Sequence, residues 1–327
     1  MRLLVVLLVI VVLLSGCIEN LTGRVVEQEP IVEETSNPPE VYFCPEDGCK
    51  EHLLSLLKSA NDSIHCALYD LDLPEIIDLL KERQDEIDVK VVTDKDNSEN
   101  ILDLNPVDNE GMSQLTHNKF CVVDGDRLFT GSFNPTEKGN SYNYNNMVIV
   151  YSEYLAKNYE NEFQELWNKE FGSGGKVKYP IIYLNGKKIE NYFCPEDSCS
   201  RHVIDNLEEA DNEIYFMSFT FTHDQIGETL VDKHKQGVKI KGIFEKFGKS
   251  QYSEYYDLED NGIEVKWDEY SYFVHHKVFI IDNRTVITGS FNPTKAGDEK
   301  NDENVLIIHD ENIAEKYLEE FEEVWNF

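Results

Sequence analysis

The segment HNKFCVVDGDRLFTGSFNPT, at residues 117–136, returns in nearly the same form as HHKVFIIDNRTVITGSFNPT at residues 275–294. Three other segments also occur twice and in the same order: a cysteine-bearing YFCPED segment, an apolar run, and an acidic, aromatic segment near the end of each copy. They begin at positions 42 and 192, 63 and 213, and 159 and 317. Ordered matches of this kind identify an internal duplication. The chain therefore contains two copies of one structural unit.

Within each copy, predicted helices alternate with short apolar runs of strand character. In the first copy the predicted order is a helix that begins after the Cys-Pro-Glu-Asp segment, with Pro45 early, then a strand at 63–72, a helix, a strand, the hairpin at 117–136, a strand and a closing helix. Alternation of this kind favours an α/β/α sandwich in each half. The expected fold class is α/β, with two tandem sandwich halves related by a pseudo-two-fold axis and an active site at their interface.

The closing helices and one loop add detail to this prediction. Aromatic residues recur every fourth position in the closing helices, which predicts core packing rather than a ligand site. They are Tyr159, Phe163 and Trp167 in the first copy and Tyr317, Phe321 and Trp325 in the second. The second copy is longer between its second strand and its hairpin, where it carries GKSQYSEYYDLEDNG at residues 248–262.

The N-terminus has the layout of an export signal. Met1 and Arg2 precede an uninterrupted apolar run, Leu3 to Leu14, which is too short to span a bilayer. The following LLSGC resembles the lipobox of prokaryotic lipoproteins, whose cysteine is lipidated. Residues 1–17 are therefore interpreted as a lipoprotein-type signal peptide with Cys17 as the lipidation site; an uncleaved anchor or a plain signal peptide are the alternatives. The working part is expected to be exported and membrane-anchored on the extracytoplasmic side.

The rest of the chain divides into a tether and two halves. Residues 18–40 are acidic and contain Pro and Asn without sustained periodicity, which predicts a flexible tether. The first half is expected at 41–172 and the second at 176–327, joined at the glycine-rich GSGGK. The formal net charge of −33 disfavours a general nucleic-acid binder, although it leaves room for a locally basic cleft.

The repeated hairpin gathers polar groups at one of its ends. A histidine and a lysine two residues apart point to one face of a strand, whereas the aspartate seven residues after the histidine has the opposite parity and belongs at the turn. A glycine, a serine and an asparagine follow on the returning strand. An imidazole, an ammonium, a hydroxyl and an amide suit a tetrahedral anion. Two such sets that meet across an axis supply a nucleophile and a general acid on opposite sides of one phosphorus atom.

The spacing His-x-Lys-x4-Asp-x6-Gly-Ser-x-Asn occurs in full in both copies, and the chain is identified by it as a member of the phospholipase D superfamily. From residue 41 onward it resembles most the compact branch, which includes a bacterial periplasmic endonuclease and the mitochondrial cardiolipin hydrolase. The resemblance implies a phosphohistidine intermediate and no metal or other cofactor. It implies that one histidine attacks phosphorus and the other protonates the leaving oxygen; we expect His117 to be the nucleophile and His275 the general acid, with the reverse assignment open. The remaining motif residues are Lys119, Asp124, Lys277 and Asp282 in the catalytic set, and Ser132, Asn134, Ser290 and Asn292 around the phosphoryl oxygens.

The superfamily also places a glutamate soon after the motif, in an Asn-x-Glu pattern, to orient a histidine. Glu303 fits this pattern in the second half, whereas Asn145 stands at the corresponding position of the first. A carboxylate favours the imidazolium form of a histidine and an amide does not. The two histidines are therefore expected to differ, either because their roles differ or because the first half has partly decayed.

The remaining cysteines and histidines give weaker signals. Each half contains a Cys-x4-Cys-x2-His pattern, and in an exported protein local disulfides are favoured over a zinc site that would have three ligands. The expected pairs come from Cys44, Cys49, Cys194 and Cys199. Cys66 and Cys121 lie in apolar strands and are predicted to be buried free thiols. His276 has the wrong parity for the catalytic face and is predicted to pack at the rim.

Three functions remain open on the sequence. The first is a phospholipase D-type phosphodiesterase that acts on phospholipid, which the expected membrane anchor and the acidic surface favour. The second is an exported nuclease of the same superfamily, which the likeness to the compact branch favours. The third is an inactive phosphate-binding surface protein. The partners expected are a phospholipid or nucleic-acid phosphodiester and the membrane itself, with no obligate protein partner.

Overall fold

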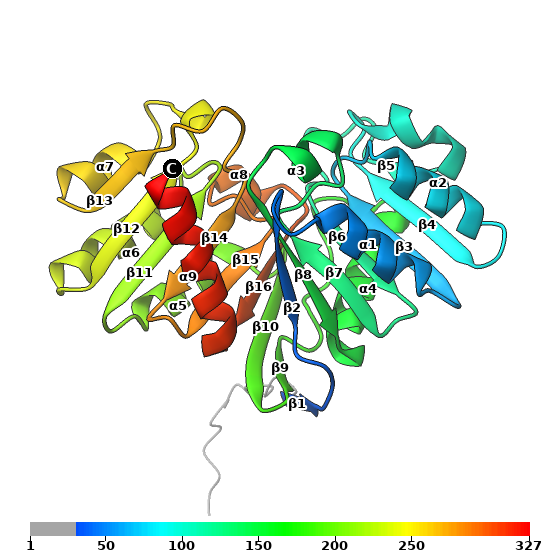
Figure 1. The fold of residues 1–327 in the computed structure, drawn as a ribbon, viewed down its shortest axis with the longest axis horizontal. Helices are drawn as coiled ribbons and strands as arrows, with labels where there is room; N and C mark the ends of the chain where they lie inside the picture. Colours follow the sequence, from blue (N-terminus) through cyan, green and yellow to red (C-terminus); the bar gives the residue numbers. More distant parts are fainter. Residues whose placement is uncertain (1–30) are drawn as a thin grey trace, which may run out of the picture.

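The computed structural model describes residues 31–327. The predicted signal peptide, Cys17 and the first part of the predicted tether lie outside this range. Within it, none of the helices combines the length and the apolar character needed to cross a membrane. Two sheets stand side by side, and each carries helices on both faces (Figure 1).

The first half forms a seven-stranded sheet in the order β2-β8-β7-β6-β3-β4-β5. Its strands are β2 (Glu40–Cys44), β3 (Ser63–Leu68), β4 (Asp88–Thr93), β5 (Val107–Asp108), β6 (Lys119–Val123), β7 (Arg127–Gly131) and β8 (Asn145–Tyr151). Its helices are α1 (Cys49–Lys58), α2 (Pro74–Arg83), the 3-10 helix η1 (Ser98–Leu104), α3 (Glu137–Ser141) and α4 (Glu153–Trp167). Side chains of β6 alternate between two cores, because successive residues of a strand face opposite sides of a sheet.

The second half repeats this arrangement in a nine-stranded sheet of order β1-β9-β10-β16-β15-β14-β11-β12-β13. Its strands are β1 (Ile31–Glu34), β9 (Ile181–Leu184), β10 (Lys187–Cys194), β11 (Glu213–Ser218), β12 (Lys239–Phe244), β13 (Glu264–Trp267), β14 (Lys277–Ile281), β15 (Thr285–Gly289) and β16 (Glu303–Ile308). Its helices are α5 (Cys199–Glu208), α6 (Asp224–Lys235), the 3-10 helix η2 (Lys246–Gly248), α7 (Tyr255–Asp260), α8 (Lys295–Glu299) and α9 (Glu311–Asn326). The longer loop of this half thus contains α7.

The closing helices α4 and α9 form a shared middle layer between the two sheets. The central apolar core contains Tyr159 and Phe163 of α4 together with Tyr317 and Phe321 of α9, all fully buried. The helices α1 and α2 on one side and α5 and α6 on the other close two outer cores. Core packing of the aromatic residues is confirmed, and the predicted α/β/α sandwiches are joined through their inner helices.

Two buried asparagines bind the halves to each other. Asn304 donates from Nδ2 to Asn118 Oδ1 (2.8 Å), while its Oδ1 accepts from Thr130 Oγ1 (3.0 Å) and Tyr159 OH (3.2 Å). Its counterpart Asn146 accepts from Thr288 Oγ1 (2.7 Å) and Tyr317 OH (3.1 Å). Asn146 Nδ2 also donates to Nδ1 of His276 (3.1 Å), whose Nε2 donates to Glu320 (3.0 Å). This paired network holds the pseudo-two-fold arrangement with its polar groups satisfied.

The structure refines three expectations about chain organisation. The end of the expected tether is ordered, because β1 pairs in parallel with β9 and Glu34 accepts bonds from the first backbone N–H groups of α4. The first helix begins at Cys49, after the Cys-Pro-Glu-Asp segment as expected, but Pro45 lies outside it, in a turn that Asp47 closes onto Phe43. The junction at 172–176 has no helix or strand and is held by bonds from Gly172 N to Asp302 (2.5 Å) and from Gly175 N to Glu165 (3.0 Å).

The asparagine network predicts an unequal response of two buried amides to truncation. Asn304→Ala removes the partner of three buried groups, so the free energy of unfolding should fall by about 2–3 kcal/mol. Asn191 is also fully buried, but neither atom of its side-chain amide has a hydrogen-bond partner. Asn191→Ala should therefore cost less than about 1 kcal/mol. Urea denaturation of both variants measures the difference, and equal losses would contradict a stabilising role for the network.

Candidate active site

The two repeated hairpins bring their histidines together at one end of the interface. Lys119 begins β6 opposite the last residue of β3, and Lys277 begins β14 opposite the last residue of β11. Each histidine therefore lies at the carboxyl end of the neighbouring parallel strands. The backbone N–H of His117 donates to Asp302 O (3.0 Å), and that of His275 donates to Tyr144 O (2.8 Å). Each hairpin is thus bonded at its histidine to the other half, beside α3 and α8 (Figure 1).

His117 is oriented by the other half. Its Nδ1 lies 2.7 Å from Oε2 of Glu303, and both groups are buried. Burial, and then the ammonium groups of Lys119 and Lys277, lower the pKa of His117 well below its ordinary value. Burial raises the pKa of Glu303 to about 8. The two groups act as one coupled pair, and this pair must lose a proton before Nε2 of His117 has a free lone pair.

His275 has an amide where His117 has a carboxylate. Its Nδ1 lies 2.8 Å from Asn145 Oδ1 and 3.1 Å from Ser132 O. Asn145 Nδ2 donates to two backbone carbonyls, of Gly139 and Asn143, which fixes the amide with its oxygen toward the imidazole. Both neighbours of Nδ1 are acceptors, so the proton stays on Nδ1 and Nε2 is left for proton transfer. Burial, Lys277 and Lys119 lower the pKa of His275.

The two lysines supply the positive charge of the site. Lys119 is fully buried and Lys277 nearly so, and each ammonium donates to the backbone carbonyl of its own histidine, at 2.6 and 2.8 Å. Burial lowers the pKa of Lys119 to about 7, despite the opposing effect of Glu303. Each ammonium keeps two donors beyond that bond. A bound phosphate anion would use these donors and stabilise both charges.

The amides and serines of the motif have separate tasks. Asn134 and Asn292 have side-chain oxygens without a hydrogen-bond partner among residues 31–327, and only the Nδ2 groups of these amides could donate to a phosphoryl oxygen. The hydroxyls of Ser132 and Ser290 face inward and accept from the backbone N–H of Asn146 (3.0 Å) and Asn304 (2.9 Å). The serines therefore support the interface asparagines, and their contact with substrate stays a prediction.

The motif glycines explain this close packing. A Cβ on Gly131 would lie 2.5 Å from Asn146 O, and one on Gly289 would lie 2.3 Å from Asn304 O. Any larger residue would push β7 away from β8, or β15 away from β16. The neighbouring strands therefore approach each other closely at these glycines.

Asp124 and Asp282 are at the hairpin turns, as their parity predicts, and their place in the catalytic set stays a prediction. The carboxylate of Asp124 accepts from the backbone N–H groups of residues 61–63 at 2.8–3.1 Å. Asp282 accepts in the same way from residues 211–213 at 2.7–2.9 Å. These aspartates tie the hairpin to the start of the neighbouring strand, at the end remote from the histidines.

The cysteines form three disulfides among residues 31–327. Cys44–Cys49 and Cys194–Cys199 confirm the predicted local pairs. Cys66–Cys121 is a third bond, so the prediction of two free thiols is wrong; the residues are direct partners across β3 and β6. The histidines of the Cys-x4-Cys-x2-His patterns stack on tyrosines, His52 on Tyr42 and His202 on Tyr192. The alternative of a zinc site at these cysteines is therefore wrong.

His276 is at the centre of the interface, fully buried between Asn146 and Glu320, and the prediction of a rim position is wrong. The interface asparagines Asn146 and Asn304 were missed, although each follows the orienting position directly in both copies. The aromatic neighbours of the histidines were missed as well. Tyr69 lies edge-on to His117 (4.9 Å between centroids), and Phe219 lies edge-on to His275 (4.7 Å).

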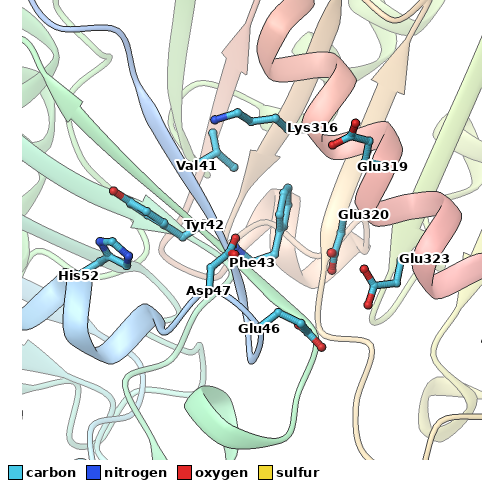
Figure 2. Close-up of a pocket in the computed structure, with 10 residues that line it drawn as sticks. All are labelled: Val41, Tyr42, Phe43, Glu46, Asp47, His52, Lys316, Glu319, Glu320 and Glu323. Atoms are coloured by element: carbon cyan, nitrogen blue, oxygen red, sulfur yellow. The ribbon is translucent and has the colours of Figure 1, made fainter.

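A second polar feature lies behind the histidine site. Figure 2 shows a groove between β2 and α9 into which Glu46, Glu320 and Glu323 point. The equivalent acids of the other copy, Glu162, Glu165 and Glu196, have carboxylate oxygens within 4.8 Å of one another, close enough to share a hard cation such as Ca²⁺. Burial, then the charges of neighbouring acids, raises the pKa of Glu196 to about 7. Glu162 and Glu320 bond to the interface residues Asn118 (3.2 Å) and His276 (3.0 Å).

Comparison with known proteins agrees with this geometry. The family model described as cardiolipin synthase, PLD-like domain, matches the chain twice, over residues 53–167 and 203–325. The chain belongs to the phospholipase D superfamily. A phospholipase D from Rickettsia typhi is 35% identical over 142 residues, which are 43% of this chain and 70% of that protein. The mitochondrial cardiolipin hydrolase of Canis lupus familiaris is 34% identical over 131 residues, 40% of this chain and 51% of that protein.

One solved structure resembles both halves together. Phosphatidylserine synthase from Haemophilus influenzae Rd KW20 superposes with a TM-score of 0.64 over 88% of this chain and 85% of that one, at 13% sequence identity. At this identity the likeness shows the tandem fold alone. With the family match and the named relatives, the chain is a phospholipase D-like hydrolase.

The turn position of Asp124 predicts a structural rather than a chemical effect of its substitution. Burial opposes its charge, but the backbone N–H groups and Arg127 lower the pKa of Asp124 to about 2. Asp124→Asn should therefore reduce the free energy of unfolding by about 1–2 kcal/mol at pH 7, while the rate per folded molecule stays unchanged.

Because its folded pKa is depressed, the stabilisation by Asp124 exists above about pH 4 and is lost as the pH falls toward 2. Denaturant titration of both proteins from pH 7 to pH 2 should show that the difference between their free energies of unfolding disappears as the pH falls. A loss of turnover with unchanged stability would instead support a catalytic role for Asp124.

Proposed function

We propose that the protein is a phosphodiesterase of phospholipase D type that hydrolyses phospholipids, without a metal, through a phosphohistidine intermediate. The observation that carries the proposal is the pair of buried histidines whose Nδ1 atoms are fixed by Glu303 and Asn145 and which share two buried lysines. Each Nε2 is then free for phosphoryl chemistry, one as a nucleophile and the other as an acid. The names of the relatives, phospholipase D and cardiolipin hydrolase, support a lipid substrate.

In the first step, Nε2 of His117 attacks phosphorus and the bond to the head-group oxygen breaks. His275 gives its Nε2 proton to that oxygen, so a neutral alcohol leaves. The new phosphohistidine carries positive charge on the imidazole, and the carboxylate of Glu303 at Nδ1 stabilises it. An amide offers less stabilisation, which is why we assign the nucleophile to His117 rather than His275.

In the second step, the neutral His275 takes a proton from water while the water oxygen attacks phosphorus. The bond between phosphorus and Nε2 of His117 breaks, and its electron pair returns to the imidazole. Lys119, Lys277 and the free amides of Asn134 and Asn292 hold the non-bridging oxygens throughout. The bound phosphodiester also favours the protonated form of His275 that the first step needs, because its charge opposes the effect of burial.

The acidic residues beside the site in the first half favour a lipid over a polynucleotide as the substrate. Asp70 lies beside Lys119, and burial and Asp72 raise its pKa. Asp96 lies further out on the same side and is exposed. A polynucleotide places a second phosphate near the scissile one, and these carboxylates would repel it. A phospholipid with one phosphate avoids that repulsion. An exported nuclease remains the second candidate, on the strength of the shared phosphate chemistry.

We also propose export and attachment to the membrane through Cys17, by the lipobox-like LLSGC segment. The first described strand, β1, lies at the end of the molecule opposite α3, α8 and the histidines (Figure 1). An attached protein would therefore hold its site at the end away from β1.

The substrate assignment is tested with the whole chain in detergent, without added metal. Phosphatidyl lipids, single-stranded DNA and a soluble chromogenic phosphodiester are supplied in parallel, and His117→Ala serves as the inactive control. Head-group release without DNA cleavage is the expected result. DNA cleavage without head-group release would replace the proposal with the nuclease.

The two orienting residues predict opposite shifts in the dependence of kcat on pH. In Glu303→Gln, His117 loses the carboxylate that holds its proton, so the acid limb should move to lower pH. The value of kcat should also fall by about 10²-fold, because the phosphohistidine loses its counter-charge. In Asn145→Asp, a new carboxylate stabilises protonated His275, so the alkaline limb should move to higher pH by about one unit.

Rates measured from pH 5 to 9 on the soluble phosphodiester separate the two limbs without the complication of a lipid surface. If Glu303→Gln moved the alkaline limb instead, the roles of the two histidines would be reversed.

A further inference from the structure

Two loops at the mouth of the site are built on the same plan, one in each half. After β4, the Asp94 carboxylate accepts from Thr116 N (3.0 Å), and after β12, the Glu245 carboxylate accepts from Val274 N (2.5 Å). Thr116 and Val274 directly precede the two catalytic histidines. The residue after each acid is also held by its backbone N–H. Lys95 donates to Asn109 and Lys246 donates to Asp268, each at 2.8 Å. Both loop tips therefore have a fixed position relative to a histidine.

The residues at the two tips differ in character. Asp94-Lys95-Asp96 in the first half corresponds to Glu245-Lys246-Phe247 in the second. Asp96 is exposed, as expected for a carboxylate, but Phe247 is also 64% exposed. The duplication thus keeps the supporting bonds and exchanges an acid for an aromatic ring at the mouth of the site.

The exposed ring of Phe247 is rigidly presented. Its backbone N–H donates to Glu245 (3.0 Å), and a Cβ on the following Gly248 would lie 2.6 Å from the carbonyl of Phe219. The loop is therefore packed closely against the chain beside His275. An exposed aromatic residue on a rigid support is available for an apolar partner without the entropy cost of ordering a flexible loop.

A continuous row of rings joins Phe247 to the catalytic histidine. Phe247 contacts Phe273 (5.2 Å between centroids), Phe273 contacts Phe219 (5.4 Å) and Phe219 contacts His275 (4.7 Å). In the first half the corresponding positions are Asp96, Leu115 and Tyr69, so no such row exists there. One rim of the site is apolar from the histidine to the solvent, and the other is acidic.

The charges around Phe247 fit an anionic lipid surface. Lys246 holds its ammonium 5.6 Å from the Phe247 ring, and exposed Lys249 follows two residues later, with its ammonium 5.3 Å from the ring of Trp267. Lys246 has two acidic neighbours, Asp268 at 3.8 Å and the buried Glu245. In a chain with a net charge of −33, two lysines beside an exposed phenylalanine form a local exception. An aromatic ring flanked by basic residues is the pattern that binds at the boundary between head groups and acyl chains.

We propose that Phe247, flanked by Lys246 and Lys249, inserts into the surface of aggregated phospholipid, so that the protein docks by the second-half rim and keeps the acidic first-half rim out of the lipid. This inference rests on the proposed phospholipid substrate. Insertion next to His275 brings the phosphodiester of a lipid to the histidines without extracting its acyl chains into water.

The test places a fluorescent reporter at each of the two equivalent tips of the full-length chain, in F247W and in the matched control D96W. Vesicles of phosphatidylcholine and phosphatidylglycerol are prepared with and without bromine atoms on the acyl chains. Bromine quenches a nearby indole, so F247W should lose fluorescence on the brominated vesicles and D96W should not. The chain already has three tryptophans, so the quenching of the unmodified protein on the same vesicles is subtracted, and the remainder reports on the introduced residue. Attachment through the N-terminus acts equally on both variants and cancels when F247W is compared with D96W.

Kinetics provide the second measurement. Phe247→Ala should lower the rate on phospholipid vesicles about tenfold, from the lost burial of one aromatic side chain, and leave the rate on the soluble chromogenic phosphodiester unchanged. Asp96→Ala should alter neither rate by more than about twofold, since a single exposed surface charge contributes little.

Equal quenching of F247W and D96W, or none in either, overturns the proposal whatever the enzyme hydrolyses. A response of F247W to single-stranded oligonucleotide but not to vesicles overturns it in favour of base stacking. Absence of head-group release by the unmodified protein, by contrast, refutes the proposed function and leaves the quenching result to be judged separately.

Discussion

The hydrogen bond between Nδ1 of His117 and the carboxylate of Glu303 crosses from one half of the chain to the other. Asn145 makes the reciprocal contact to His275. Neither half can orient its own histidine, so the site exists only when the two copies are in register. The buried asparagine network, the shared layer of α4 and α9 and the short backbone contacts at the motif glycines all serve to keep that register.

Tandem duplication in one chain allows the two copies to diverge, and three exchanged positions show where they have. A carboxylate is replaced by an amide behind one histidine, a tyrosine by a phenylalanine beside it, and an aspartate by a phenylalanine at the loop tip. In the proposed mechanism, the first exchange separates the chemical roles of the histidines. The other two give the site one polar and one apolar rim. The residues that the copies share therefore form the groups proposed for the reaction, and the exchanged residues make the two sides of the site different.

The duplicated motif made the fold and the phosphate site predictable from the sequence, because strand parity places His117 and Lys119 on one face. Parity also placed Asp124 at the turn, where its carboxylate contacts backbone N–H groups, whereas a catalytic role for it was suggested by motif membership alone. Contacts between residues far apart in the chain were not predictable. The bond between Cys66 and Cys121 depends on the register of β3 with β6, and the burial of His276 depends on the packing of one half on the other. The pairing of β1 with β9 was not predictable, because a strand of four residues is too short to show a hydrophobic period in the sequence.

The central claim is that one histidine, and not its copy, carries the covalent intermediate. The direct measurement is mass spectrometry of the protein after mixing with a phosphodiester that has a good leaving group, quenched in alkaline denaturant because phosphohistidine is unstable in acid. The adduct should be found on the peptide that contains His117, should accumulate in His275→Ala and should be absent from His117→Ala. An adduct on His275, or equal labelling of both histidines, would contradict the account.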